Sequence, residues 1–369
     1  MMKNKLVYIT YQTFPAFTAN SIQTMTNIKF FCKLGIDVTL IFPLRNKESR
    51  SDLNILQKFY EFSESLNSIG TIHPLPFKKI KFFQRYMFLI SHFLWSYFTV
   101  RKYAKNNNNE IIYMTRSEWV FFFLSKLNKQ VIYECHLLSR LKKRLIEKSI
   151  QKPNSKLILL TPHMAKELKL ENDDQFIILP NAYDEQVFNN NNLDKKNKRL
   201  VYAGTLFRFG EGRGLELLNK EAQNLKDLGV EIVIASSDSQ VNRLRQDFID
   251  IEDLNIEYYE NLSRNEISKL YSSCEIGLLI NNDSEHANKF TSPLKYFEYI
   301  ASGLKVVAID NPSHRNLPYQ DKIEFFTHAN SSSFVEALKQ ALKAEQPNYE
   351  NIDQYNMINR CSKIINLFD

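Results

Sequence analysis

The chain has 369 residues, 44% of them hydrophobic, which excludes an intrinsically disordered protein and favours two domains of ordinary size. Its four cysteines lie far apart in the sequence, which argues against a disulfide framework or a zinc site and for a reducing cytoplasm. The net charge of +7 is unevenly spread: residues 1–150 hold 23 Lys and Arg against 9 Asp and Glu, and the remainder holds 25 against 32. No nucleic-acid-binding motif accompanies the basic half, and the chain opens directly on a strand without a secretory signal.

Strands and helices alternate through residues 1–188, which predicts a Rossmann-like α/β domain with a parallel sheet. The predicted strands are Leu6–Thr10, Asp37–Phe42, Thr71–Leu75, Glu110–Met114, Gln130–Cys135, Lys156–Leu160 and Phe176–Leu179. The predicted helices are Ser21–Leu34, Leu53–Leu66, Lys79–Ala104, Glu118–Leu127 and Arg140–Ile150.

A polar run at residues 189–198 reads as a linker, and the alternation restarts in a second Rossmann-like domain over residues 199–347. Its predicted strands are Arg199–Ala203, Val230–Ala235, Asn255–Tyr259, Glu275–Ile280 and Lys305–Ile309. Its predicted helices are Leu215–Asp227, Arg264–Ser273, Pro293–Ser302 and Ser332–Ala344. Residues 348–369 contain a last amphipathic helix, expected to pack back toward the N-terminal domain. Two doubly wound domains facing each other would place ligand in the cleft at the carboxyl ends of their strands.

The segment Phe77–Lys105 mixes cations with aromatic side chains at its start and continues as an apolar helix. Its apolar stretch, Met87–Val100, is shorter than the roughly twenty residues that a membrane-spanning helix needs. Three interpretations remain open: a buried core helix, a peripheral contact with an anionic membrane face, or a solvated charged face.

Polar residues follow several predicted strands of the first domain. In the sequence VIYECHLL, Glu134 and His136 lie on one face at the carboxyl end of a strand, where they could bind a substrate hydroxyl. A histidine bonded to backbone at a strand end is the alternative for His136. Arg116 also follows a strand, and Ser21 is expected to cap the first helix.

Glycine is scarce in this chain, and four of its nine glycines fall between Leu200 and Leu218. Gly204, Gly210, Gly212 and Gly214 follow a predicted strand and precede a helix, in a loop that also carries Arg208 and Arg213. Glycine permits close approach of the backbone to a ligand, and arginine suits phosphate oxygens. The pattern therefore favours a diphosphate site over a flexible surface turn.

The sequence FTSPLKYFEYIASGLKVVAID, from Phe290 to Asp310, predicts a helix followed by a buried strand. Ser292 is the expected N-cap and Pro293 the expected first helical residue. The free N–H groups there and Lys295 would form an anion site. Glu298 lies on the apolar stripe of this helix and needs a partner. It would bind ribose hydroxyls or form a solvent-facing pair with Lys295.

These segments together resemble the GT-B glycosyltransferases of the large retaining family that includes glycogen synthases, sucrose synthases and bacterial envelope sugar transferases, also called group 1 glycosyltransferases. The resemblance runs in order along nearly the whole chain. It is carried by KFFCKLGIDVTLIFP, VIYECH, LPNAYDEQVF, VYAGTLFRFGEGRG and SPLKYFEYIASGLKVVA, of which the last two are specific.

The resemblance implies a role for each matching residue. Glu298 would bind the donor ribose, Arg213 and Arg208 the diphosphate, and His136 would lie near the transferring sugar. Leu294 and Lys295 would lie near the phosphates, and Thr291 and Ser292 near the sugar, while Gly204, Ser21, Arg116 and Glu134 would complete the substrate-binding set. Two departures stand out: Phe290 replaces the first of the family's two glutamates, and Thr205 replaces an arginine that usually follows the strand glycine.

The resemblance thus implies a retaining glycosyltransferase that moves a sugar from a nucleotide diphosphate sugar to a hydroxyl of a glycan or lipid-linked acceptor for envelope polysaccharide. No Asp-x-Asp motif in a strand context is present, so neither a metal nor a further cofactor is expected. The expected location is the cytoplasm, with peripheral contact at the inner face of the plasma membrane. A UDP-sugar 2-epimerase and a non-catalytic nucleotide-sugar or glycan binder remain alternatives.

Overall fold

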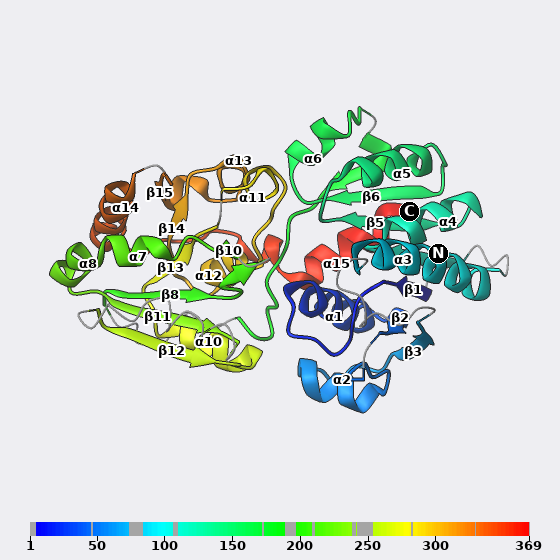
Figure 1. Ribbon diagram of the computed structural model, residues 1–369, viewed down its shortest axis with the longest axis horizontal. Coiled ribbons are helices and arrows are strands. Elements are labelled where there is room, and N and C mark those ends of the chain that lie inside the picture. The colour runs from blue at the N-terminus through cyan, green and yellow to red at the C-terminus, as the bar shows by residue number, and fades with distance from the viewer. Residues whose placement is uncertain are drawn as a thin grey trace. The chain divides into compact units, whose positions relative to one another are not determined.

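The computed structural model of the chain describes residues 5–45, 47–73, 84–105, 110–171, 173–188, 197–208, 211–237, 241, 254–281, 283–328 and 330–368. It divides into two compact units (Figure 1). Unit 1 comprises Met1–Pro180 and Met357–Asp369, and unit 2 comprises Asn181–Asn356. Most of the predicted linker (residues 189–196) and the cations Lys78, Lys79 and Lys81 lie outside the described residues.

Unit 1 is built on one sheet of seven parallel strands in the order β3-β2-β1-β4-β5-β6-β7. Its strands are β1 (Lys5–Ile9), β2 (Asp37–Leu44), β3 (Asn67–Ile72), β4 (Ile111–Thr115), β5 (Val131–Cys135), β6 (Ser155–Leu159) and β7 (Phe176–Ile178). Its helices are α1 (Ala19–Lys33), α2 (Leu53–Tyr60), α3 (Gln84–Tyr103), α4 (Glu118–Lys126), α5 (Arg140–Ile150), α6 (Pro162–Glu167) and α15 (Met357–Ile365). The predicted doubly wound α/β architecture is confirmed.

Two predicted elements of unit 1 were misplaced. The strand expected at Thr71–Leu75 begins earlier, because Asn67 pairs with Thr39 of β2 at the sheet edge. The strand is polar and partly exposed, so it lacks the apolar run by which a strand is recognised in a sequence. The helix expected to reach Leu66 ends at Tyr60, because Glu61 adopts a left-handed conformation with φ 54°.

The last helix of the chain returns to unit 1, as the sequence predicted. Helix α15 packs against α1 and buries Met357, Cys361 and Ile364. The Cys361 thiol donates to the carbonyl of Asn27 in α1 at 3.7 Å. The C-terminal segment is therefore part of the first unit's core (Figure 1).

Unit 2 has a parallel sheet of the same winding, in the order β12-β11-β8-β13-β14-β15, and a separate antiparallel pair, β9 and β10. Its strands are β8 (Arg199–Ala203), β9 (Phe207–Arg208), β10 (Glu211–Gly212), β11 (Glu231–Ser236), β12 (Ile256–Glu260), β13 (Ile276–Leu279), β14 (Lys305–Ile309) and β15 (Ile323–Phe326). Its described helices include α7 (Glu216–Lys220), α8 (Ala222–Leu228), α10 (Arg264–Ser272), α11 (Glu285–Lys289), α12 (Leu294–Ala301), α13 (Pro312–Arg315) and α14 (Ser331–Lys343). The helix predicted at Leu215–Asp227 is two short helices that meet at Glu221.

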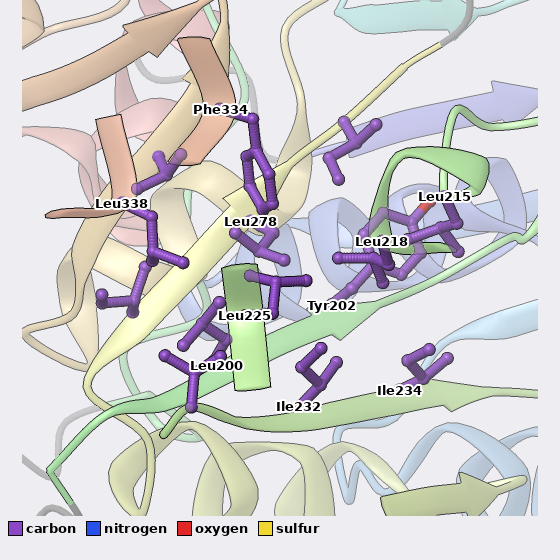
Figure 2. Packing of buried hydrophobic residues seen from close by; sticks show 14 of the residues in the cluster. Leu200, Tyr202, Leu215, Leu218, Leu225, Ile232, Ile234, Leu278, Phe334 and Leu338 are labelled. Atoms are coloured by element: carbon purple, nitrogen blue, oxygen red, sulfur yellow. The ribbon is translucent and has the colours of Figure 1, made fainter. Parts of the chain in front are cut away.

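Alternate residues of the unit 2 strands face two different hydrophobic clusters. On one face, Leu200 and Tyr202 of β8 pack with residues of α7, α8 and α14 (Figure 2). On the other face, Val201 and Ala203 pack with residues of α10 and α12. Strand order reverses between β8 and β13, and at such a switch point an open α/β sheet holds its ligand beyond the strand ends.

Gly277 of β13 allows α12 to lie close to the sheet. A Cβ at Gly277 would come within 2.4 Å of the Tyr299 ring. The Tyr299 hydroxyl is within 3.3 Å of the Val201 carbonyl and 3.4 Å of the Leu278 carbonyl, so this residue ties α12 to β8 and β13. The absence of a side chain at Gly277 thus allows α12 to pack directly on β13.

We expect Gly277→Ala to lower the free energy of unfolding of unit 2 by roughly 1–3 kcal/mol, because the buried ring has no free space to move into. Denaturant titration followed by circular dichroism measures the change. An unchanged unfolding midpoint would contradict the close packing of α12 on β13.

Candidate active site

The glycine after β8 and the first turn of α12 meet at one point of unit 2. Gly204 has φ +132°, and a Cβ placed on it would lie 3.5 Å from the Lys295 Nζ. The same Nζ lies 3.7 Å from the centre of the Tyr202 ring. Two segments ninety residues apart are therefore adjacent at the carboxyl edge of the sheet, beside the switch point.

Arg213 lies at the same edge. Its guanidinium donates to the side-chain oxygen of Asn281, which follows β13. Its Nε is buried and, among the described residues, has no hydrogen-bond partner. Gly214 lies against the end of β13, because a Cβ at this glycine would come within 2.9 Å of the Ile280 side chain. A cation with an unused donor thus borders the glycine turn.

The two cations influence each other. Burial lowers the pKa of Lys295 to about 7, with a further contribution from the positive charge of Arg213. Among the described residues, no carboxylate lies within ion-pair distance of the Lys295 amine. Two neighbouring cations, whose charges are only partly offset by the Glu298 carboxylate, suit the binding of a diphosphate.

Arg208 belongs to β9 in the same loop, where its backbone pairs with that of Glu211 in β10. Gly210 lies outside the described residues, so the sequence-predicted glycine loop is described only at Gly204, Gly212 and Gly214. The hairpin was missed from sequence, because its strands have two residues each.

The predicted cap of α12 is wrong by one residue. Pro293 is the N-cap, with extended ψ 119°, and Leu294 is the first helical residue. Ser292 instead accepts the Asn181 backbone N–H at 2.9 Å, and its carbonyl accepts from the Asn181 side chain. Thr291 donates its hydroxyl to the Ala287 carbonyl at 2.9 Å. Both hydroxyls therefore support the loop that leads into the helix.

Glu298 is buried and paired with a residue that the sequence reasoning did not single out. Arg264, at the start of α10, lies 2.6 Å from Glu298 Oε1, and the Tyr271 hydroxyl donates to Oε2 at 3.4 Å. The Arg264 guanidinium also stacks over the Phe188 ring. The alternative of a solvent-facing pair between Lys295 and Glu298 is therefore wrong. Phe290, at the position of the family's first glutamate, is buried after α11.

A buried charge cluster lies at the carboxyl end of β5 in unit 1. Glu134 is fully buried and pairs with Arg360 of α15 at 2.5 Å. Arg360 also donates to the Pro180 carbonyl at 2.8 Å and to Asn27 at 3.1 Å. Burial alone would raise the pKa of Glu134, but the positive charges of Arg360 and Arg116 hold it well below its usual value. Glu134 is thus an ionised anchor for the C-terminal helix.

His136 and Arg116 adjoin this carboxylate. His136 Nε2 lies 3.3 Å from Glu134 Oε1, and Arg116 Nε lies 3.9 Å from Oε2. Burial, together with Arg116, lowers the pKa of His136 to about 4, so its imidazole is neutral near pH 7. A neutral ring can donate or accept one hydrogen bond to a sugar hydroxyl. The structure therefore brings these three predicted residues together.

Ser21 does not cap the first helix. Thr18 is the N-cap of α1, and its hydroxyl oxygen accepts the Ser21 N–H. Ser21 donates to the Thr13 carbonyl at 3.2 Å, while its neighbour Asn20 accepts from Arg116. The helix begins earlier than predicted, because threonine caps a helix nearly as well as serine.

Within the part of the chain that the structure describes, no three His, Cys, Asp or Glu side chains are grouped so that they could hold a metal ion. None of the described helices is both long and apolar enough to cross a membrane.

Comparisons with known proteins found a similar segment and similar folds. Residues 213–352 match the family described as "Glycosyl transferase-like". No match was found among curated proteins. Sucrose-phosphate synthase from Thermosynechococcus elongatus has a similar structure, with a TM-score of 0.67 at 13% identity over 98% of this chain and 95% of that one.

Two further solved structures are similar over 98% of this chain. WaaG, a glycosyltransferase involved in lipopolysaccharide biosynthesis, has a TM-score of 0.60 at 13% identity, with 99% of its chain covered. The catalytic domain of starch synthase IV from Arabidopsis thaliana, bound to ADP and acarbose, has a TM-score of 0.59 at 13% identity, with 95% covered.

The chain has the GT-B fold of two Rossmann-like units, and its residues 213–352 are glycosyl transferase-like. These findings are consistent with the predicted resemblance to the group 1 glycosyltransferases.

Proposed function

We propose that this protein is a retaining, metal-independent glycosyltransferase that moves a sugar from a nucleotide diphosphate sugar to a hydroxyl of a glycan or lipid-linked acceptor. The acceptor would be a precursor of envelope polysaccharide, handled in the cytoplasm at the inner membrane face. One observation carries the donor assignment: the Lys295 amine lies beside Gly204, with Arg213 close enough to lower its pKa. This arrangement suits a pyrophosphate.

The proposed chemistry follows from the leaving group. As the bond from the sugar carbon to the diphosphate oxygen breaks, negative charge grows on the phosphates, and Arg213 and Lys295 would stabilise it. The acceptor oxygen bonds to the sugar carbon on the same face, and its proton passes to the leaving phosphate oxygen. Arg208, the loop at Thr291 and Ser292, and the backbone of Leu294 would complete the donor site.

The ribose and the transferred sugar would be bound by other groups. Glu298, held by Arg264 and Tyr271, would accept the ribose hydroxyls with its remaining lone pairs. In unit 1, the neutral imidazole of His136 would bind a hydroxyl of the sugar. Glu134, 3.3 Å from the Nε2 of this ring, would orient it, and Arg116, Asn20 and Ser21 would border the acceptor.

The alternative of a non-catalytic binder is favoured by one observation. Phe290 is buried and apolar, and the resemblance aligns it with the family's first glutamate, whose contact to the donor sugar this chain would then lack. A UDP-sugar 2-epimerase is a weaker alternative, because the described site offers no additional acid and base. Release of nucleoside diphosphate only with acceptor indicates transfer, a changed free sugar indicates epimerisation, and neither product indicates a binder.

The donor assignment predicts a selective loss of phosphate affinity in Arg213→Ala. We expect affinity for UDP, GDP or ADP, whichever binds the wild type best, to fall about tenfold or more, while affinity for the matching nucleoside stays unchanged. Isothermal titration calorimetry measures both. Arg315→Ala, which removes an exposed arginine paired with Asp310, is the matched control. Equal losses for nucleoside and diphosphate would refute the assigned role of Arg213.

A further inference from the structure

Between Tyr86 and Thr99, helix α3 exposes large apolar side chains and buries polar ones. Every exposed residue from Tyr86 to Phe98 is large and apolar or aromatic: Tyr86, Leu89, Ile90, Phe93, Tyr97 and Phe98. Ile90 is 50% exposed and Phe98 57%. The buried residues include Ser91, His92, Ser96 and Thr99. We call the six exposed residues the α3 outer face; on a helix of a water-soluble domain this polarity is inverted.

Hydrogen bonds fix the helix in this orientation. His92 Nε2 lies 2.7 Å from the Ser117 hydroxyl, and the Ser91 hydroxyl lies 2.7 Å from His73 Nε2. The Trp95 indole donates to Thr71 at 2.7 Å. Rotation of the helix to bury its apolar side would break these bonds inside the unit. These hydrogen bonds therefore keep the α3 outer face exposed.

The patch continues onto α4, which packs beside α3 (Figure 1). Phe93 contacts Trp119 edge-to-face at 4.8 Å and also packs on Phe123. Lys126 lies over the Phe122 ring. Partly exposed aromatic rings with a cation at their margin are typical of the water–lipid interface, where ring and ammonium reach the headgroup layer.

The charge of this region indicates an anionic partner. Residues 65–109 contain seven Lys and Arg and no Asp or Glu. Arg101, Lys102 and Lys105 are exposed at the end of α3, next to the apolar face. Two copies of the chain joined through this face would bring two wholly basic segments together, which disfavours a homodimer.

We propose that the α3 outer face docks this protein on an anionic lipid bilayer, with α3 lying in the plane of the headgroups. The six apolar side chains enter the headgroup and acyl boundary, and the flanking cations bind acidic headgroups. The proposal deepens the membrane contact included in the proposed function by naming its surface, and it is independent of the donor site in unit 2.

Vesicle co-sedimentation tests the surface. We expect the wild type to bind vesicles of equal parts phosphatidylcholine and phosphatidylglycerol, and to bind pure phosphatidylcholine weakly. Ile90→Gln combined with Phe98→Gln should weaken binding to the anionic vesicles about tenfold or more. The matched control is Ile55→Gln with Phe17→Gln, two exposed apolar residues elsewhere in unit 1, which should bind as the wild type does.

A second pair of variants tests the charge. Lys102→Gln with Lys105→Gln should weaken anionic-vesicle binding several-fold, whereas Lys343→Gln in α14 should not. All seven substituted positions in these experiments are exposed. Circular dichroism and donor calorimetry verify that each variant keeps its fold and its donor affinity.

Two results would overturn the proposal. If the α3 variant binds anionic vesicles as well as the wild type does, another surface makes the contact. If the wild type binds no vesicles but forms a dimer that the α3 variant loses in analytical ultracentrifugation, the occupant is a second copy. Donor affinity is measured separately. A wild type that binds donor but no vesicles contradicts the membrane contact alone and leaves the proposed sugar transfer in place.

Discussion

Replacing Lys295 by Met is expected to slow sugar transfer about a hundredfold or more, because one cation that stabilises the leaving diphosphate is lost. The same change is expected to stabilise the free protein. Burial and Arg213 lower the pKa of Lys295 to about 7, so folding currently forces a charged amine into an unfavourable place. Methionine keeps most of the length of the side chain over the Tyr202 ring, without the charge.

The pH dependence gives this prediction a second readout. The folded pKa of Lys295 is about 7 and its unfolded value is 10.5, so the unfolded chain binds more protons between these values. Wild-type stability should therefore rise with pH across this range, and the gain from Lys295→Met should be largest below pH 7. Affinity for the nucleoside diphosphate should fall over the same range in the wild type, because binding the anion requires a protonated amine.

Thermal unfolding at several pH values and steady-state turnover measure the two effects. Lys305→Met is the control, since Lys305 pairs with Glu275 at 2.8 Å at the other end of β14. It should lose stability and retain donor affinity. Normal turnover of Lys295→Met would remove Lys295 from the donor site, and a loss of stability would contradict the unfavourable burial of its charge.

Local patterns in the sequence located much of this site. The strand that ends at Ala203, the glycine after it and the helix that carries Lys295 all have strong local signatures, namely apolar runs and glycines at element boundaries. Parallel winding then brings the strand ends to one edge, so the meeting of Gly204 and Lys295 follows from topology.

The partners of buried charges could not be found in this way. The sequence indicated that Glu298 needs a partner but did not identify it. Arg264 lies on another helix, α10, and its neighbouring residues indicate only an ordinary capped helix start. Asn281 and Arg360 were missed for the same reason. The caps at Thr18 and Pro293 were misplaced because several neighbouring residues suit a cap, and tertiary contacts decide among them.

Replacing Arg360 by Met is expected to lower the free energy of unfolding of unit 1 by about 3–5 kcal/mol, because it leaves the buried Glu134 carboxylate without its main counterion. It also removes the bond from α15 to the Pro180 carbonyl. Urea unfolding, followed by circular dichroism, measures the loss. Arg315→Met, which breaks an exposed pair with Asp310, should cost less than about 1 kcal/mol.

The double variant Glu134→Gln with Arg360→Met separates the lost charge pair from the lost packing. With no carboxylate to leave unpaired, it should be more stable than Arg360→Met alone. Since the folded pKa of Glu134 lies well below its unfolded value, the pair's contribution is complete above the unfolded pKa of about 4.3 and is lost as pH falls through the folded pKa. The wild type should therefore lose stability in acid more steeply than the double variant. If the free energies of unfolding of the two proteins fell equally steeply with falling pH, an ionised Glu134 would not be the anchor of the C-terminal helix.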